Sequence, residues 1–266
     1  MPELPEVETV VRRLRAPLIG RTFEDVRVEW ERMVQLPVLE LRTRLSGQRV
    51  QKIARRGKYL VFRLTGEDTL IFHLKMTGDL QVFPADDAFH QHDRVMFSLD
   101  NGHQLRFRDQ RKFGRVYLTD TPDQMLGRLG PEPLDEAFTE HDFLALFNGR
   151  SGRIKPLLLD QEFIAGLGNI YADEALFLTG IRPQRRASTL TDEDKRRLYR
   201  AIRQVLSIAI EQNGTSLPDE TYQGGQYQQQ FLVYGREDQP CSRCDNPIQR
   251  IQLGQRSAHF CPSCQH

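Results

Sequence analysis

Long apolar runs are missing from this sequence. None approaches the ~18 residues that a membrane-spanning helix needs, and 27% of the residues are charged. The opening residues MPELPEVE carry acids where a secretory signal would carry basic residues followed by an apolar stretch. We therefore expect neither a membrane protein nor a secreted one, and we predict a cytoplasmic location.

An excess of charge of one sign is also missing. The 37 Lys and Arg residues face 36 Asp and Glu residues, which gives a net charge of +1. A polyanionic partner would therefore have to be held by local patches and not by bulk charge. Two stretches supply such patches, because residues 42–58 are basic without a single acid and residues 106–115 contain only one.

Cysteine is scarce and confined to one place. All four cysteines lie within the last 26 residues, as Cys241-x2-Cys244 and Cys261-x2-Cys264. Two CxxC turns joined by a hairpin present four thiolates to one zinc ion; the alternative is a pair of structural disulfides, which intracellular chains rarely hold. The strands expected at 248–251 and 258–260 are too short to bury a core, so metal would stabilise this module. With four protein ligands, the predicted Zn²⁺ is structural.

The remaining pattern divides the chain into a β-rich part and a helical part. Residues 2–15 have the apolar spacing of an amphipathic helix with an acidic first turn. Short β segments broken by glycines fill residues 22–119, which is typical of a β-sandwich or barrel. Beyond the GPEPL segment, helices are expected at about 139–148, 154–162, 170–178 and 192–212. The polar, glycine-rich stretch that follows Gln212 is poor material for a core and is typical of a mobile loop.

The start of the chain offers a nucleophile. If Met1 is removed, Pro2 carries a free secondary amine, which can form a Schiff base with an aldehyde-like carbon. An α-amino group has a reference pKa of about 7.7–8.0; the positive end of a helix would lower it, and Glu3 and Glu6 would oppose that change. The same pattern also suits ordinary capping of a helix that opens with proline and acids.

Three glycine-bounded turns carry cations. Arg55, Arg56 and Lys58 lie at a turn before a strand, where their side chains can converge on phosphates or form a solvated charged face. Met76 and Phe113 lie on two further turns beside lysines, as suits apolar wedges that enter a base stack. Taken separately, each of these two patterns favours a side chain buried in the core.

A helix, a glycine turn and a second helix are expected around AGLGNIYADEALF. Asn169 would cap the second helix, and the backbone amides of Asn169 and Ile170 could bind a phosphate. The alternative is a turn that only packs two helices together.

Eight segments, in order and spread over essentially the whole chain, resemble the bacterial formamidopyrimidine-DNA glycosylase family. They are MPELPEVETV, RRGKYL, HLKMTG, RKFG, IKPLLLDQ, AGLGNIYADEALF, QQQFLVYGRE and CSRC with RSAHFCPSCQ. The resemblance implies an α+β fold with three parts: an N-terminal β-sandwich domain with flanking helices (1–130), a helix-two-turn-helix domain (131–215), and a lesion-capping loop with a C-terminal zinc-finger β-hairpin (216–266).

The resemblance also implies a base-excision repair enzyme that excises oxidised purines and nicks the strand by β,δ-elimination. By the family pattern Pro2 is the nucleophile and Glu6 supports it. Glu3 is the general acid and base, and Lys58 is a phosphate contact that assists the chemistry. The implied DNA-binding residues are Met76, Arg111, Phe113, Lys155, Asn169 and Arg256, with Arg111 facing the orphaned cytosine. The implied partner is double-stranded DNA containing oxidised bases or abasic sites, bound by a monomer at the nucleoid.

Some positions depart from the family pattern. Lys75 stands where the family often has Gly, Gln110 where Pro is common, and Ala258 where Thr is usual. Residues 217–225 fall where the family caps an extruded oxidised guanine, but their composition does not match its pattern. An endonuclease VIII-like enzyme for oxidised pyrimidines and a catalytically silent binder of damaged DNA are the alternatives.

Overall fold

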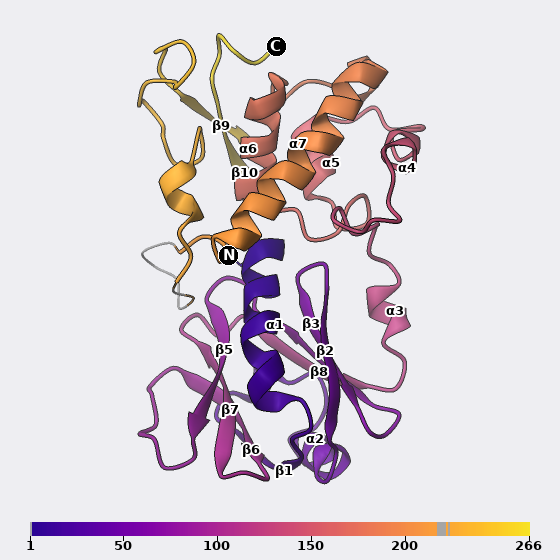
Figure 1. Ribbon diagram of the computed structural model, residues 1–266, viewed down its shortest axis with the longest axis vertical. Coiled ribbons are helices and arrows are strands. Elements are labelled where there is room, and N and C mark those ends of the chain that lie inside the picture. Colours follow the sequence, from indigo (N-terminus) through magenta and orange to yellow (C-terminus); the bar gives the residue numbers. More distant parts are fainter. Residues whose placement is uncertain (1, 217–221, 223) are drawn as a thin grey trace. The chain divides into compact units, whose positions relative to one another are not determined.

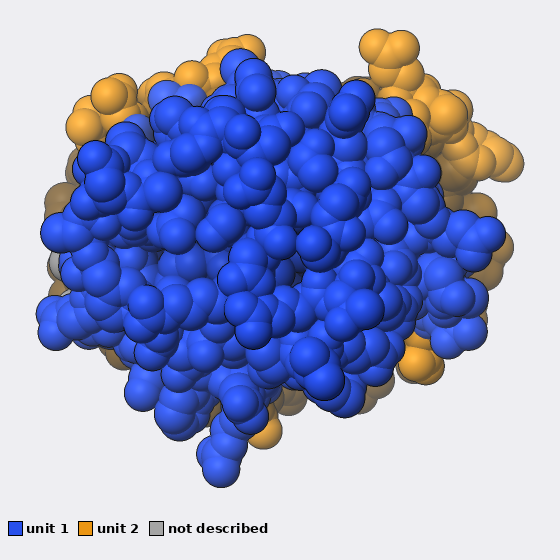
Figure 2. Space-filling view, turned by 90° about the horizontal axis from the view of Figure 1, so that it is seen from below, with its two compact units in different colours: residues 1–127, 213–225 blue, residues 128–212, 226–266 orange. Residues whose placement is uncertain are grey.

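The computed structural model describes residues 2–216, 222 and 224–266. The chain forms two compact units, the first made of residues 1–127 and 213–225 and the second of residues 128–212 and 226–266 (Figure 2). Within the described ranges no helix is both long and apolar enough to cross a membrane.

Helix α1 (Leu4–Leu18) opens the first unit and confirms the predicted amphipathic helix. Its buried stripe contains Val7, Val10, Val11 and Leu14, at the spacing that puts side chains on one helix face. The helix begins with a capping box between Glu3 and Glu6, in which the Glu6 side chain accepts the Glu3 backbone N–H.

Two antiparallel four-stranded sheets form the body of the first unit (Figure 1). One has the order β1 (Phe23–Val28), β6 (Asp93–Leu99), β7 (His103–Asp109), β5 (Gly78–Pro84). The other has the order β2 (Val50–Arg56), β3 (Tyr59–Leu64), β4 (Thr69–His73), β8 (Arg115–Thr119).

The sheets pack face to face, which confirms the predicted sandwich. The Phe72 ring of one sheet lies edge-on to Phe97 and Phe107 of the other, with centroids 5.6 and 5.9 Å apart. Helix α1 contacts strands of both sheets, and it shares their hydrophobic core. Three shorter helical segments in this unit lack a long apolar stripe and are not predicted by the sequence: η1 (Glu31–Met33), α2 (Val38–Leu45) and α3 (Asp123–Leu126).

Residues 213–225 return to the first unit after the helical part of the chain. Tyr222 is buried in the sandwich core, and its hydroxyl donates to the carbonyl of Asn213. The expectation that this stretch is poor material for a core is therefore wrong at Tyr222, where an aromatic ring outweighs its polar neighbours. Most of the segment expected to cap a lesion, residues 217–221 and 223, lies outside the described residues.

The second unit is helical and ends in a hairpin. Its elements are α4 (Glu140–Ala145), α5 (Ile154–Leu159), α6 (Asn169–Thr179), η2 (Ala187–Thr189), α7 (Asp192–Glu211), η3 (Tyr227–Gln230), β9 (Gln249–Leu253) and β10 (Arg256–Phe260). Helices α4 and α7 each begin with a capping box. Helix α6 is buried on nearly every side, since it packs against α5, α7 and β10. The four predicted helices are present, although α4 and α5 each end three residues early.

Candidate functional site

The beginning of α1 brings together three of the four predicted catalytic residues. Pro2, Glu3 and Glu6 are all buried there. One carboxylate oxygen of Glu6 accepts the backbone N–H of Glu3, and the other accepts that of Thr215, both at 2.7 Å. Gly214 makes this approach possible: it has φ +75°, and a Cβ there would lie 2.6 Å from Glu6 Oε1. Glu6 therefore fixes the chain immediately after Pro2 and ties it to residues 214–215.

Lys58 and His73 lie on the second sheet of the sandwich. Lys58 follows the Gly57 turn between β2 and β3, and its side chain is mostly buried, with the residue 7% exposed. His73 ends β4; its Nδ1 accepts the backbone N–H of Lys75 at 2.9 Å, and its ring lies edge-on to Tyr59. Burial, and then the charges of Lys75, Lys58 and Arg115, lower the pKa of His73 to about 3. The imidazole is therefore neutral, with its proton on Nε2, among three cations.

This buried neutral imidazole predicts an acid-sensitive fold. Because the pKa is about 6.5 for an ordinary histidine and about 3 for His73 in the fold, the unfolded state takes up the proton first. The stability that this pKa difference contributes is complete above about pH 6.5 and is lost progressively as the pH falls toward about 3. We expect His73→Gln to flatten the pH dependence of the free energy of unfolding in that window, measured by urea titration. An unchanged pH dependence of the free energy of unfolding in the variant would contradict a neutral His73 in the fold. A comparison of the two proteins at about pH 8 isolates the packing cost of the substitution.

Met76, Arg111 and Phe113 lie on two turns of the first sheet. Met76 precedes β5 and is half-buried; Phe113 follows β7 and is exposed over 45% of its surface. The Arg111 guanidinium lies over the Phe113 ring, 4.9 Å from its centroid. Exposing a phenyl ring to water is unfavourable, and a ring with a cation on one face is suited to stacking against a base.

Several arginines of the two basic stretches form ion pairs within the first unit. Arg106 is buried against the carboxylate of Asp93 and backbone carbonyls, and Arg108 pairs with the same acid. In the other basic stretch, Arg55 pairs with Glu8 at 3.1 Å. The expectation that these runs form continuous anion-binding patches is therefore wrong for these three arginines, since their acidic partners come from distant strands and from α1.

A polar cavity of about 560 Å³ marks the second unit. It lies between the start of α6 and the β9–β10 hairpin and is lined by Asn169, Tyr234, Arg250, Gln252, Arg256 and Ser257, among others. Arg256, which is exposed, begins β10 directly after the hairpin turn, where Gly254 has φ +63°. Gly168 is the cap of α6 and Asn169 its first residue, so the expected capping role of Asn169 is wrong by one position. The cavity combines a helix N-terminus with an arginine, which is a suitable environment for a phosphate.

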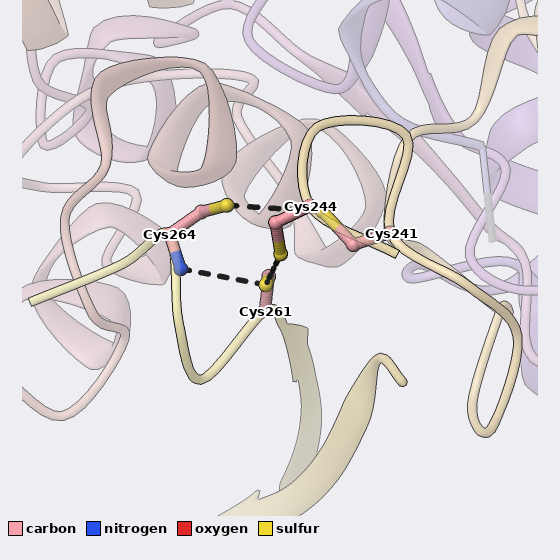
Figure 3. A group of neighbouring side chains, drawn as sticks. All are labelled: Cys241, Cys244, Cys261 and Cys264. Atoms are coloured by element: carbon pink, nitrogen blue, oxygen red, sulfur yellow. Dashed lines mark hydrogen bonds between the residues drawn. The ribbon is translucent and has the colours of Figure 1, made fainter. Parts of the chain in front are cut away.

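The four cysteines converge on one point (Figure 3). All four Sγ atoms lie within 4.8 Å of one another, and Sγ–Sγ distances of 3.9 Å (Cys241 to Cys264) and 3.5 Å (Cys244 to Cys261) are far longer than a disulfide bond. A tetrahedron with Zn–S bonds of about 2.3 Å has edges of about 3.8 Å. Backbone N–H groups of Arg243 and Cys264 point at two of the sulfurs, as expected around thiolates. The group fits one Zn²⁺ and leaves no position for a catalytic water.

Comparison with known proteins gives the same assignment over the whole chain. Three family models match: the "Formamidopyrimidine-DNA glycosylase N-terminal domain" at residues 1–116, the "Formamidopyrimidine-DNA glycosylase H2TH domain" at 129–221, and the "Zinc finger found in FPG and IleRS" at 238–266. A formamidopyrimidine-DNA glycosylase of Pelotomaculum thermopropionicum is 47% identical over 100% of this chain and 99% of its own. The chain belongs to the formamidopyrimidine-DNA glycosylase family.

Solved structures agree with this family assignment. Lactococcus lactis Fpg in complex with DNA containing an abasic site superposes with a TM-score of 0.92 at 38% identity, covering 99% of both chains. The same protein with DNA containing an oxidised pyrimidine superposes with a TM-score of 0.92 at 37% identity, again over 99% of both. The resemblance stated from sequence motifs is confirmed, as are the α+β fold and the single structural zinc.

The backbone explains one departure from the glycosylase pattern. Lys75 has φ 56°, a left-handed conformation that costs a non-glycine residue about 1–2 kcal/mol. Glycine adopts this conformation without strain, so the family's frequent choice of Gly there has a physical reason. In this chain the strained residue places a cation beside Met76.

Lys155 is buried, and its ammonium group has partners within the second unit. Its residue is 1% exposed, its Nζ lies 2.6 Å from Asp173 Oδ1, and it also donates to the carbonyl of Ser257. Asp173 in turn accepts the backbone N–H of His259. The prediction that Lys155 binds DNA stays a prediction, and the structure shows its ammonium group joining α5, α6 and β10.

Sequence reasoning did not find the roles of Asp173 and Glu174, the carboxylates that tie two backbone segments to α6. Glu174 accepts three consecutive backbone N–H groups, from Leu232, Val233 and Tyr234, at 2.8–3.0 Å. Burial raises the pKa of Glu174, and these three hydrogen bonds act against that rise. The AGLGNIYADEALF motif contained both acids, but only their burial on a helix enclosed by other elements reveals their role.

Proposed function

We propose that this chain is a bifunctional DNA glycosylase and abasic-site lyase that removes oxidised purines, such as 8-oxoguanine and formamidopyrimidines, from duplex DNA. The observation that carries the proposal is the buried Pro2–Glu3–Glu6 group at the start of α1, in a chain that belongs throughout to the formamidopyrimidine-DNA glycosylase family. We propose that it acts as a monomer on the chromosome, in the cytoplasm at the nucleoid. The relatives solved with damaged DNA support this choice of partner.

The chemistry follows from a free amine beside a carboxyl group. With Met1 removed, the Pro2 nitrogen attacks C1′ of the damaged nucleotide and the C–N bond forms. The glycosidic bond breaks as the base leaves with its electron pair, and the proton that the Pro2 nitrogen loses balances the one that the base takes up. Glu3 supplies a proton to the sugar ring oxygen as the ring opens to the iminium, and it acts as base and acid in later steps. Loss of the C2′ proton then expels the 3′-phosphate, and a second elimination expels the 5′-phosphate.

The other residues bind and orient the DNA. Lys58 and Arg256 carry charges suited to phosphate oxygens, and the first amides of α6 at Asn169 provide a neutral anion site. Glu6, which holds two backbone N–H groups, keeps Pro2 and Glu3 in place. Met76, Arg111 and Phe113 fill the space left by the extruded nucleotide, with Arg111 facing the unpaired cytosine.

Parallel cleavage assays test the substrate class. Duplexes with 8-oxoguanine opposite cytosine should be cut much faster than duplexes with thymine glycol opposite adenine. The reverse order of cleavage rates would indicate an enzyme for oxidised pyrimidines, and one relative has been solved with DNA that contains such a base. Binding without cleavage of either duplex, by protein shown to lack Met1, would make it a silent binder of damaged DNA.

The wedge residues are expected to matter for base extrusion and much less for strand cleavage. Flipping a paired base costs a few kcal/mol, whereas an abasic site presents little to extrude. Replacing Arg111 and Phe113 with Ala should therefore slow excision from 8-oxoguanine:cytosine by about 10- to 100-fold while leaving cleavage at a preformed abasic site within a fewfold of wild type. Arg256→Ala is the matched control: losing a phosphate contact should weaken both substrates alike and flatten the salt dependence. Equal losses in the wedge variant would show that these side chains supply only general affinity.

A further inference from the structure

Asp109 is a fully buried carboxylate to which the mechanism above gives no role. It ends β7, and its residue is 0% exposed. Its Oδ1 accepts the hydroxyl of Thr77 and the backbone N–H of Arg111 at 3.1 Å, and its Oδ2 accepts the backbone N–H of Gly114 at 2.7 Å. The Thr77 hydroxyl oxygen also accepts the Arg111 N–H, at 3.0 Å. One carboxylate thus receives three donors that come from two different turns.

These two turns carry the three wedge residues. Thr77 directly follows Met76, and Arg111 and Gly114 enclose Lys112 and Phe113. Each turn also contains a lysine in the left-handed conformation, Lys75 with φ 56° and Lys112 with φ 61°. Non-glycine residues keep such a conformation only when their surroundings hold it. The buried carboxylate provides hydrogen bonds close to both strained positions.

Close packing leaves both turns little room to rearrange. A Cβ on Gly114 would lie 2.5 Å from Phe107 Cζ and 2.9 Å from Met33 Cε, and one on Gly78 would lie 2.4 Å from the carbonyl oxygen of Leu74. The glycine beside each wedge turn is therefore pressed against the core. Each turn is thus held by packing against the core, and Asp109 holds the two turns to each other.

We propose that Asp109 is a positioning residue that locks the two turns into one rigid body, so that Met76, Arg111 and Phe113 enter the duplex together. This inference rests on the proposed function, because it explains how the wedge is presented. A carboxylate is needed because all three of its neighbours are donors; an amide would direct its own N–H groups at one of them. The position of the wedge is thus set by a side chain that touches neither the DNA nor the reacting atoms.

The chain contains its own reporter for this lock. Trp30 is the single tryptophan, and the Nζ of Lys112 lies 4.1 Å from the centroid of a Trp30 ring. Lys112 stands between Arg111 and Phe113, so a loosened turn should withdraw its side chain from the indole. Acrylamide quenching of tryptophan fluorescence therefore measures the state of the turn without any substrate.

The test compares Asp109→Asn with Asp93→Asn. Asp93 is equally buried in the same sheet, but its carboxylate pairs with Arg106 and Arg108 and not with the three donors that Asp109 holds, so it controls for the loss of a buried charge. In single-turnover assays Asp109→Asn should slow excision from 8-oxoguanine:cytosine by about 10- to 100-fold, leave cleavage at a preformed abasic site nearly unchanged, and increase quenching of Trp30. Asp93→Asn should change neither the ratio of the two rates nor the quenching.

A second variant guards against a general folding defect. Thr77→Val removes one donor of the same network, so combining it with Asp109→Asn should add little to either single effect. Additive losses, equal losses on the two DNA substrates, or the same quenching change in Asp93→Asn would each overturn the inference. If the wild-type protein excises no base at all, the proposed function fails instead; the quenching comparison still decides whether Asp109 holds the turn.

Discussion

In protein that retains Met1, the rates of base excision and of abasic-site cleavage are both expected to fall by about 10³-fold or more. The Pro2 nitrogen is then part of a peptide bond, where its lone pair is delocalised into the carbonyl and cannot attack C1′. Most other side chains of the site would be unchanged, since Glu6 holds the backbone of Glu3 and Thr215 through its own carboxylate. The loss should therefore fall on the chemistry and not on DNA affinity.

Intact mass separates the two forms before the assay. Processed and Met1-retaining protein should bind an uncleavable abasic-site analogue with similar Kd and differ only in turnover. Pro2→Gly, once processed, keeps a free primary amine and should retain part of the activity. Normal turnover by protein whose mass shows Met1 in place would exclude the Pro2 amine as the nucleophile.

Replacement of a zinc ligand is expected to have the second largest effect. Cys261→Ser should remove the metal, unfold the β9–β10 hairpin and weaken binding to damaged duplex by about 100-fold. The hairpin strands have five residues each, and the local core around Cys241 and Cys261 contains only a few apolar side chains. Without zinc, the contacts of Glu174 and Asp173 with neighbouring backbone cannot by themselves maintain the turn that presents Arg256.

Metal analysis and proteolysis test this expectation together. The wild type should contain one zinc per chain and Cys261→Ser none, while fragments of residues 1–127 should stay protease-resistant in both. Ser242→Ala, at an exposed position inside the first CxxC turn, is the matched control and should keep both metal and affinity. Full DNA binding by metal-free protein would contradict a structural role for the ion.

Local sequence patterns predicted those features whose interacting residues lie close together in the sequence. The i, i+3, i+4 spacing of Val7, Val10 and Val11 gave α1, and paired CxxC turns gave the metal site, because in each case spacing alone puts the side chains together. The alternating strands and glycine turns indicated a sandwich before the contacts of Phe72 with the opposite sheet were known.

Long-range partners account for what sequence could not predict. Arg55 and Arg106 look like DNA-binding cations until Glu8 and Asp93 are found beside them. Lys155 fits a phosphate ligand by motif, yet Asp173 and the Ser257 carbonyl enclose its ammonium group. Asp109 was read as one acid in a basic run, and only the fold shows that it joins turns about 35 residues apart in sequence. No local periodicity encodes such pairings.

The most direct measurement is borohydride reduction of the protein during its reaction with 8-oxoguanine DNA, followed by peptide mapping of the adduct. A Schiff base between the Pro2 nitrogen and C1′ predicts one stable protein–DNA crosslink, located on the N-terminal peptide with Met1 absent. A crosslink mapped to Lys58 or to any other lysine, or the absence of a crosslink in protein that cleaves DNA, would contradict the mechanism.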